Sequence, residues 1–221
     1  MPQGYFLAIA GNIGVGKTEL TDRLAAELGW RVYYEPVIDN PYLDPFYKDM
    51  ERWSFHLQMY FLGERFKAQV RIGQSGESFI QDRTIYEDAE IFARTLHAQG
   101  SMTQVDYDNY VALFDCMVAF LRKPDLILYL KASPDTLMRR IAKRGRPSEQ
   151  SITTDYIVRL NHAYDDWMRR ARADTEVMEI DTEHVPLQGD TEAFRKLVDD
   201  LKRRYPQQVE MRLDAHGAPG V

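Results

Sequence analysis

Gly11-Asn-Ile-Gly-Val-Gly-Lys-Thr18 is the stretch of this sequence that decides the fold. It lies between an apolar run, residues 5–10, and a helical pattern that starts at Glu19. A G-x-x-x-x-G-K-T pattern between a strand and a helix is typical of a phosphate-binding loop, because glycines let successive backbone N–H groups turn toward phosphate oxygens. A Gly-rich turn alone would not need Lys17 and Thr18, which suit a transferred phosphoryl group and Mg²⁺. We therefore expect a nucleoside triphosphate to bind here, on Gly11, Asn12, Gly14, Val15, Gly16, Lys17 and Thr18.

The composition is that of a globular enzyme. The 221 residues, of which 44% are hydrophobic and 28% charged, are enough to bury the core of one α/β domain. The formal net charge of −6 argues against a nucleic acid polymer as the main partner. The single cysteine, Cys116, excludes an intrachain disulfide, and we expect it to be a buried helix residue. Because the sequence shows neither a secretory signal nor a membrane-spanning run, we expect no membrane partner and a cytoplasmic location.

Short apolar strands alternate with longer amphipathic helices along the chain. This pattern predicts an α/β fold, a five-stranded parallel sheet with helices on both faces. The expected strands span residues 5–10, 31–34, 78–81, 125–130 and 176–180. The expected helices span residues 17–28, 51–72, 84–98, 103–121, 134–143, 154–172 and 191–204. Residues 1–204 form a single predicted domain, and residues 205–221, which lack periodicity, form a tail that we expect to be frayed.

Polar residues follow two of the predicted strands, at the sheet edge where ligands bind such folds. Glu35 follows the second strand, and Asp82-Arg83-Thr84 follows the third. Each carboxylate alone would suit a solvated strand end or a helix N-cap. Beside the loop, they form a set suited to phosphoryl transfer, which needs a carboxylate to take a hydroxyl proton, a cation at the transferred group and an oxygen ligand for Mg²⁺. Glu35, Arg83 and Asp82 are the candidates for these three roles, with Lys17 as a further catalytic cation.

A run of arginines closes a later predicted helix. Arg140, Arg144 and Arg146 lead into a segment with Gly and Pro that contains Glu149. Such charge runs are often solvated helix faces. Near a phosphate-binding loop, this run predicts a lid over residues 140–152 that closes on the triphosphate, excludes water and offsets charge during transfer.

Five separated motifs together resemble the deoxynucleoside kinases, the family that includes deoxycytidine, deoxyguanosine and deoxyadenosine kinases. They are GNIGVGKT, the EPV of residues 35–37, RWSFHLQ at 52–58, DRT-x-Tyr-x-Asp at 82–88 and R-x-x-x-R-x-R-x-x-E at 140–149. They occur in family order within residues 5–180, and NPYLDPFY at 40–47 looks particularly like bacterial purine-type members. The resemblance implies a P-loop kinase fold and an ATP- and Mg²⁺-dependent enzyme that phosphorylates the 5′-hydroxyl of a deoxynucleoside in nucleotide salvage.

The resemblance also implies roles for individual residues. Glu35 corresponds to the base that activates the 5′-hydroxyl, and Arg83 to the arginine beside the reacting oxygens. Asp82 and Thr18 would flank Mg²⁺. The other matches are Tyr47 and Glu149 at the sugar 3′-hydroxyl, Gln58 and Asp88 at the base edge, Phe92 on the base face, and Arg140, Arg144 and Arg146 as lid cations.

The side chains at the predicted base edge favour an amino-bearing base. An ionised Asp88 only accepts hydrogen bonds, so it suits an exocyclic amine and disfavours the 4-carbonyl of thymine, while Gln58 offers both a donor and an acceptor. Arg65, which resembles the family position paired with that aspartate, could donate to the 6-carbonyl of guanine. Deoxyadenosine, deoxyguanosine and deoxycytidine therefore stay open. So does the plainer alternative that these three side chains lie on the surface of two amphipathic helices.

Two other functions stay open at this point. A nucleoside monophosphate kinase such as thymidylate kinase shares the loop, an Asp-Arg pair and an arginine lid, but commonly has an arginine where this chain has Tyr34. A nucleotide-dependent switch would need no acceptor pocket, and the sequence lacks an N-K-x-D guanine signature. The resemblance further implies a homodimer through the helices near 51–72 and 103–121, whose apolar residues could equally belong to the core: Phe55, Tyr60, Phe114 and Met117.

Overall fold

A five-stranded parallel sheet forms the centre of the structure, a computed structural model that describes residues 4–34, 40–185, 187–189 and 191–206. The strands run in the order β2-β3-β1-β4-β5. They are β1 Phe6–Gly11, β2 Arg31–Tyr33, β3 Phe79–Asp82, β4 Leu126–Lys131 and β5 Glu176–Asp181. β1 is buried along its whole length and pairs with β3 on one side and β4 on the other. Such a strand fits a sheet that is covered on both faces.

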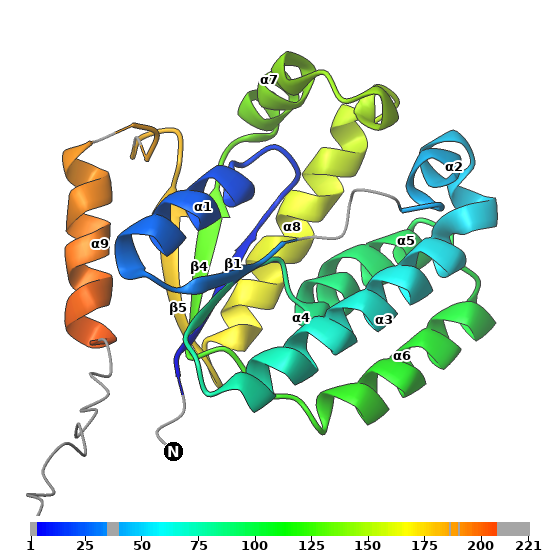
Figure 1. The fold of residues 1–221 in the computed structure, drawn as a ribbon. Coiled ribbons are helices and arrows are strands. Elements are labelled where there is room, and N and C mark those ends of the chain that lie inside the picture. Colours follow the sequence, from blue (N-terminus) through cyan, green and yellow to red (C-terminus); the bar gives the residue numbers. More distant parts are fainter. Residues whose placement is uncertain (1–3, 35–39, 186, 190, 207–221) are drawn as a thin grey trace, which may run out of the picture.

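Helices cover both faces of this sheet (Figure 1). α1 and α9 lie on one side, and α8 lies on the other with α3 and α6 beyond it. The α-helices are α1 Lys17–Leu28, α2 Leu43–Lys48, α3 Met50–Ser75, α4 Ile85–Glu87, α5 Arg94–Ala98, α6 Gln104–Val118, α7 Pro134–Arg144, α8 Thr154–Ala171 and α9 Glu192–Arg204. A π-helix, η1 Asp88–Ala93, joins α4 to α5, and a short 3-10 helix, η2 Pro147–Glu149, follows α7.

Local sequence signals set the ends of the helices, as α7 illustrates. The hydroxyl of Ser133 accepts a hydrogen bond from the N–H of Thr136, and Pro134 occupies the first helical position, where its missing N–H is not needed. Gly145 ends the helix with a positive φ of 66°. The same kind of cap, a threonine hydroxyl bonded to the third residue of the helix, starts α6, α8 and α9.

The predicted secondary structure is confirmed for all five strands and all seven predicted helices. Each strand begins and ends within one residue of the prediction, and each helix within three. The sequence did not predict α2, because Pro41 and Pro45 suggest a turn. Pro45 is tolerated because it lies in the first turn of α2, where backbone N–H groups have no partner within the helix. The π-helical stretch inside the predicted helix 84–98 was not foreseen either.

The predicted burial of Cys116 is wrong, because this residue is exposed. α6 packs on α3 through one face, on which Tyr110 is the buried residue. Cys116 lies on the opposite face, together with Val105. Within the described residues, no helix is long and apolar enough to cross a membrane.

Tyr205, the first residue of the predicted tail, belongs to the ordered body. Its ring contacts Tyr5 and Trp30, with centroid distances of 5.0 and 6.2 Å, and its hydroxyl donates to Glu176 at 3.4 Å. The last part of the predicted tail, residues 207–221, lies outside the described residues.

Candidate active site

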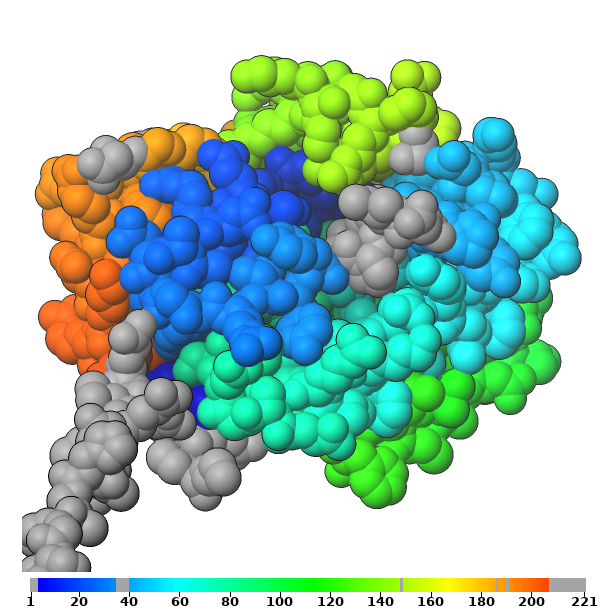
Figure 2. Space-filling view, viewed as in Figure 1, coloured from blue at the N-terminus to red at the C-terminus, as the bar shows by residue number. Residues whose placement is uncertain are grey.

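A cavity of about 860 Å³ lies at the carboxyl ends of the strands, between the phosphate-binding loop, α2, α3 and the lid formed by residues 140–152. Figure 2 shows this hollow beside the blue atoms of the loop and below the yellow-green atoms of the lid. Its volume is in the range of small-molecule sites. Most predicted site residues line it, namely Gly14, Val15, Gly16, Lys17, Thr18, Tyr47, Gln58, Asp82, Arg83, Asp88, Phe92, Arg140, Arg144, Arg146 and Glu149.

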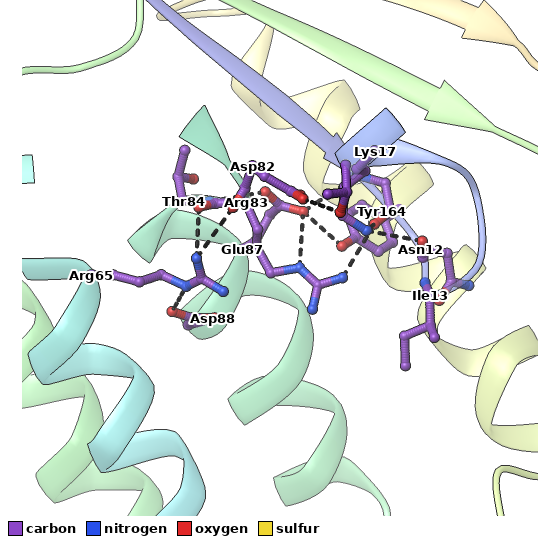
Figure 3. A network of polar contacts seen from close by, with 12 residues as sticks. Asn12, Ile13, Lys17, Arg65, Asp82, Arg83, Thr84, Glu87, Asp88 and Tyr164 are labelled. Atoms are coloured by element: carbon purple, nitrogen blue, oxygen red, sulfur yellow. Dashed lines mark hydrogen bonds and ion pairs between the residues drawn. The ribbon is translucent and has the colours of Figure 1, made fainter. Parts of the chain in front are cut away.

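The phosphate-binding loop needs glycine where it turns and where it packs closely. Gly14 has a φ of 82°, and a Cβ there would approach Cγ1 of Ile141 to 2.8 Å. Gly16, with a φ of 101°, caps the N-terminus of α1. The N-terminus of this helix therefore borders the cavity, where its dipole favours an anion. The Lys17 ammonium is buried over the loop and donates to the carbonyls of Gly11 at 2.7 Å and Asn12 at 3.1 Å (Figure 3).

Thr18 and Asp82 form a pair of oxygen ligands suited to Mg²⁺. The Thr18 hydroxyl donates to Oδ2 of Asp82 at 2.6 Å, and both residues line the cavity. Asp82 is buried, and its Oδ1 has no hydrogen-bond partner among the described residues. Mg²⁺ is commonly held by one or two carboxylates together with phosphate oxygens and water. The described residues contain no cluster of three or more His, Cys, Asp and Glu side chains that could hold a metal ion.

Arg83 stands at the centre of the site in a left-handed backbone conformation. Its φ of 66° is the only positive value at a non-glycine residue in the described part of the chain. Such a conformation costs about 1–3 kcal/mol and persists where the surroundings hold it. Here the N–H of Arg83 donates to Ile9, and its carbonyl accepts from Nη1 of Arg65 at 2.7 Å. The guanidinium lies 4.4 Å from the ring centroid of Phe92, so one face of that ring contacts Arg83.

Gln58, Arg65 and Asp88 are buried, which rules out the alternative that they are surface residues. Arg65 and Asp88 form an ion pair with a distance of 2.5 Å between Nε and Oδ2. Gln58 and Asp88 line the cavity, whereas Arg65 is not among the lining residues. The Oε1 atom of Gln58 has no hydrogen-bond partner in the described part of the structure. Asp88 and Phe92 both belong to the π-helical turn η1, a type of distortion that often occurs at functional sites.

Hydrogen bonds and ion pairs connect the residues of the lid to one another and to neighbouring elements. Arg144 binds both carboxylate oxygens of Glu149 through its Nη2 atom, each at 2.7 Å, and Arg146 lies 3.5 Å from the same carboxylate. Arg140 donates to the hydroxyl of Thr182 at 2.8 Å and to its carbonyl at 2.9 Å. The Ser151 hydroxyl donates to the carbonyl of Tyr47 at 3.1 Å, which connects the lid to α2.

Not every predicted residue borders the cavity. Gly11 and Asn12 do not line it. The amide of Asn12 points toward α8 instead, where it donates to the carbonyl of Ile157 and to Asn161. Glu35, the predicted base, lies outside the described residues, directly after the lining residue Tyr34.

Three buried residues of the site were missed by sequence reasoning. Tyr156 lines the cavity, and burial raises the pKa of its hydroxyl, which keeps it neutral. Glu87 and Tyr164 lie behind the loop and share a hydrogen bond of 2.7 Å. Only Glu87 had a local signal, since Thr84-x-x-Glu87 reads as a capping box, and that signal says nothing about contacts with other elements.

Comparison with known families identifies the chain. A family model described as deoxynucleoside kinase matches residues 7–204. The deoxyadenosine/deoxycytidine kinase of Bacillus subtilis is 40% identical over 203 residues, which cover 91% of this chain and 93% of that protein. The deoxyadenosine kinase of Dictyostelium discoideum is 41% identical over 167 residues, with coverage of 76% and 68%.

The fold agrees with solved structures of such enzymes. A structure of deoxyadenosine kinase from M. mycoides with bound dATP has a TM-score of 0.77 and 30% identity, and the match covers 90% of this chain and 99% of that one. Among the three activities left open by the sequence, the family match selects one. The chain belongs to the deoxynucleoside kinase family, and it is a phosphotransferase with a P-loop kinase fold.

Proposed function

We propose that this enzyme transfers the γ-phosphoryl group of ATP to the 5′-hydroxyl of deoxyadenosine and deoxycytidine in preference to thymidine. The observation that carries the base preference is the buried Arg65–Asp88 pair beside Gln58. Asp88 pairs with an arginine at 2.5 Å, and a carboxylate only accepts hydrogen bonds. Adenine and cytosine both present an exocyclic amine to such an acceptor. The names of the relatives from Bacillus subtilis and Dictyostelium discoideum support the same two nucleosides.

The donor triphosphate would occupy the end of the cavity formed by the loop and the lid. Lys17 and the N-terminus of α1 supply positive charge from below, and Arg140, Arg144 and Arg146 supply it from the lid. The dATP bound to the deoxyadenosine kinase from M. mycoides supports an adenine triphosphate as a ligand of this fold. Mg²⁺ would be held by Thr18 and Asp82, and when bound it would offset charge on the phosphates.

The acceptor would lie at the opposite end of the cavity. Gln58 and Asp88 would bind the base edge and Phe92 a face of the base, while Tyr47 and Glu149 would bind the sugar 3′-hydroxyl. Glu35 would accept the proton of the 5′-hydroxyl, and Arg83 would stabilise charge on the transferred group. Because Glu149 also binds Arg144, a sugar held by Glu149 would bring the lid arginine close to the reacting phosphate.

We further propose that the enzyme is a homodimer through the exposed face of α6 and that it works in the cytoplasm. Phe55, Tyr60, Phe114 and Met117, which the sequence left between interface and core, are partly buried against the core of their own chain. Val105, Leu113 and Phe120 are instead exposed, and Phe120 has 84% of its side chain accessible. Val105 and Leu113 lie on α6 and Phe120 directly after it, and exposed apolar side chains gathered on one side of a protein are typical of an interface.

The proposed activity is tested by following labelled phosphate from ATP onto the four natural deoxynucleosides and onto their monophosphates. We expect labelled monophosphate when a nucleoside is the acceptor, and no labelled diphosphate when a monophosphate is the acceptor. We expect kcat/KM for deoxyadenosine and deoxycytidine to exceed that for thymidine by at least about tenfold, since one hydrogen-bond mismatch at a buried edge is worth roughly 1–3 kcal/mol. Lys17→Ala is the control and should abolish most turnover. Preference for thymidine, or labelled diphosphate made from thymidine monophosphate, would contradict the proposal.

A further inference from the structure

Glu87 is a fully buried carboxylate behind the active site. It is the last residue of α4, and none of its surface is accessible to solvent. Its Oε2 atom accepts from the N–H of Thr84 at 3.1 Å. Its Oε1 atom accepts from the Tyr164 hydroxyl at 2.7 Å and from the N–H of Gly11 at 3.3 Å, and it lies 3.7 Å from Nε of Arg83 (Figure 3). Glu87 is not among the residues that line the cavity, so it has no route to a nucleotide in this structure.

Two contacts of Oε1 lead to Gly11, the first residue of the phosphate-binding loop. Glu87 holds the N–H of Gly11, while the carbonyl of Gly11 accepts from Lys17 at 2.7 Å and from Arg83 at 3.5 Å. Lys17 and Arg83, which both border the cavity, therefore donate to the same carbonyl, that of Gly11. Glu87 accepts from the N–H of the same residue. Glu87 thus contacts Gly11 at the end of β1 and Arg83 directly after β3, and Gly11 in turn accepts from Lys17 of α1.

Helix capping explains only one of the two carboxylate oxygens. The capping box pairs Oε2 with Thr84, and a box of this kind commonly lies at the surface. Burial raises the pKa of Glu87, and the neighbouring Arg83, Lys17 and Tyr164 lower it. Because burial of a carboxylate is costly, helix capping alone does not explain an acidic residue at this buried position. The contacts of Oε1 all lead to α8 or to the site.

We propose that Glu87 is a positioning residue for phosphoryl transfer, which holds the Arg83 guanidinium and the backbone of Gly11 in a fixed position relative to each other. It acts through Arg83 and Gly11 and does not touch the substrate. The inference rests on the proposed role of Arg83 at the transferred group. A displacement of that guanidinium by about 1 Å is enough to lower turnover by up to a hundredfold.

Glu87→Gln tests the proposal, because glutamine keeps the size of the side chain and can still serve in a capping box. We expect kcat to fall by about tenfold or more with the best of the four deoxynucleosides, while KM for the nucleoside changes by less than about twofold. Thr84→Val is the matched control, since it removes the other half of the same capping box and leaves the contacts of Oε1 intact. If the two variants lose kcat in proportion to their loss of melting temperature, Glu87 is only a cap and the proposal fails.

A double-mutant cycle with Arg83→Lys separates this proposal from the proposed role of Arg83. If Glu87 acts through Arg83, the double variant has a kcat within about twofold of Arg83→Lys alone. Losses that multiply would overturn the proposal. An Arg83→Lys variant with normal kcat would instead remove Arg83 from the proposed function. Should Glu87→Gln fail to fold, Tyr164→Phe takes its place: a loss of kcat of about threefold or more at unchanged KM supports the proposal, and an unchanged kcat overturns it.

Discussion

Arg65 serves two parts of the site at once. Its Nε atom pairs with Asp88, and its Nη1 atom donates to the carbonyl of Arg83. The first contact sets the acceptor that faces the base, and the second supports the left-handed backbone of the arginine at the phosphate end. A substitution of Arg65 therefore lowers turnover for every nucleoside, and base preference has to be measured as a ratio.

We expect Asp88→Ala combined with Arg65→Met to favour thymidine. The pair is changed together because removal of the carboxylate alone would leave the arginine charge buried, which costs about 3–5 kcal/mol. Without the acceptor at the base edge, kcat/KM for thymidine should improve at least about tenfold relative to deoxyadenosine and deoxycytidine. Steady-state rates with the three nucleosides measure this ratio. The wild-type enzyme, measured with the same three nucleosides, gives the reference ratio. An unchanged ratio in the double variant would remove Asp88 from base recognition.

Sequence reasoning brought most of these residues to one cavity, but it did not assign their contacts. The position of Asp82 and Arg83 follows from the end of a parallel strand, which a sequence pattern reveals. Three features depend on how the helices pack around the loop and the cavity. They are the direction of the Asn12 amide, the position of Arg65 behind the cavity and the contact between Glu87 and Gly11. Those contacts join residues far apart in the chain, so no local pattern predicts them.

The lid owes its shape to a few polar contacts. Glu149 is nearly buried and gathers Arg144 and Arg146, whose side chains are 35% and 43% exposed. Solvent screens the exposed arginine end of each pair, and surface ion pairs contribute about 0–1 kcal/mol to stability. The lid arginines therefore contribute little to folding.

Arg144→Ala should accordingly reduce kcat by at least about tenfold and lower the melting temperature of the free enzyme by less than about 4 °C. Arg139→Ala is the matched control, because Arg139 lies on the same helix, is exposed and is not among the residues that line the cavity. Thermal melts without ligand and steady-state rates on both variants give the comparison. A large loss of stability with normal kcat would show that Arg144 is structural.

Strands and long helices were the elements that the sequence predicted well. Each carries several apolar residues at its own period, and caps such as Ser133 and Gly145 mark the ends. α2 has only six residues and contains a proline, so neither signal is present. The π-helical turn at Asp88–Ala93 adds one residue to the repeat of a helix, and the apolar period of the sequence does not signal it.

The exposed apolar face of α6 bears on the assembly of the whole molecule. Phe120→Glu combined with Leu113→Glu should convert the proposed dimer into a monomer, because each charge would be buried without a partner at the interface. Sedimentation or light scattering measures the mass of each variant. Gln104→Glu, on the same helix and away from this face, is the control and should leave the mass unchanged. A wild-type enzyme that is already monomeric would contradict the proposed homodimer.

The place of β1 at the centre of the sheet has a consequence for synthesis on the ribosome. β1 is made first, yet its two neighbours are residues 79–82 and 126–131. Gly11, which opens the loop, pairs with Leu130. A nascent chain therefore carries the fully buried strand β1 with at least one unpaired edge until residues 126–131 have been made. Such long-range parallel pairing is slow, and it leaves unpaired strand edges that can associate with other chains. During that interval the growing polypeptide depends on the ribosome or on chaperones to cover this strand. It can bind nucleotides only after the fourth strand has been made.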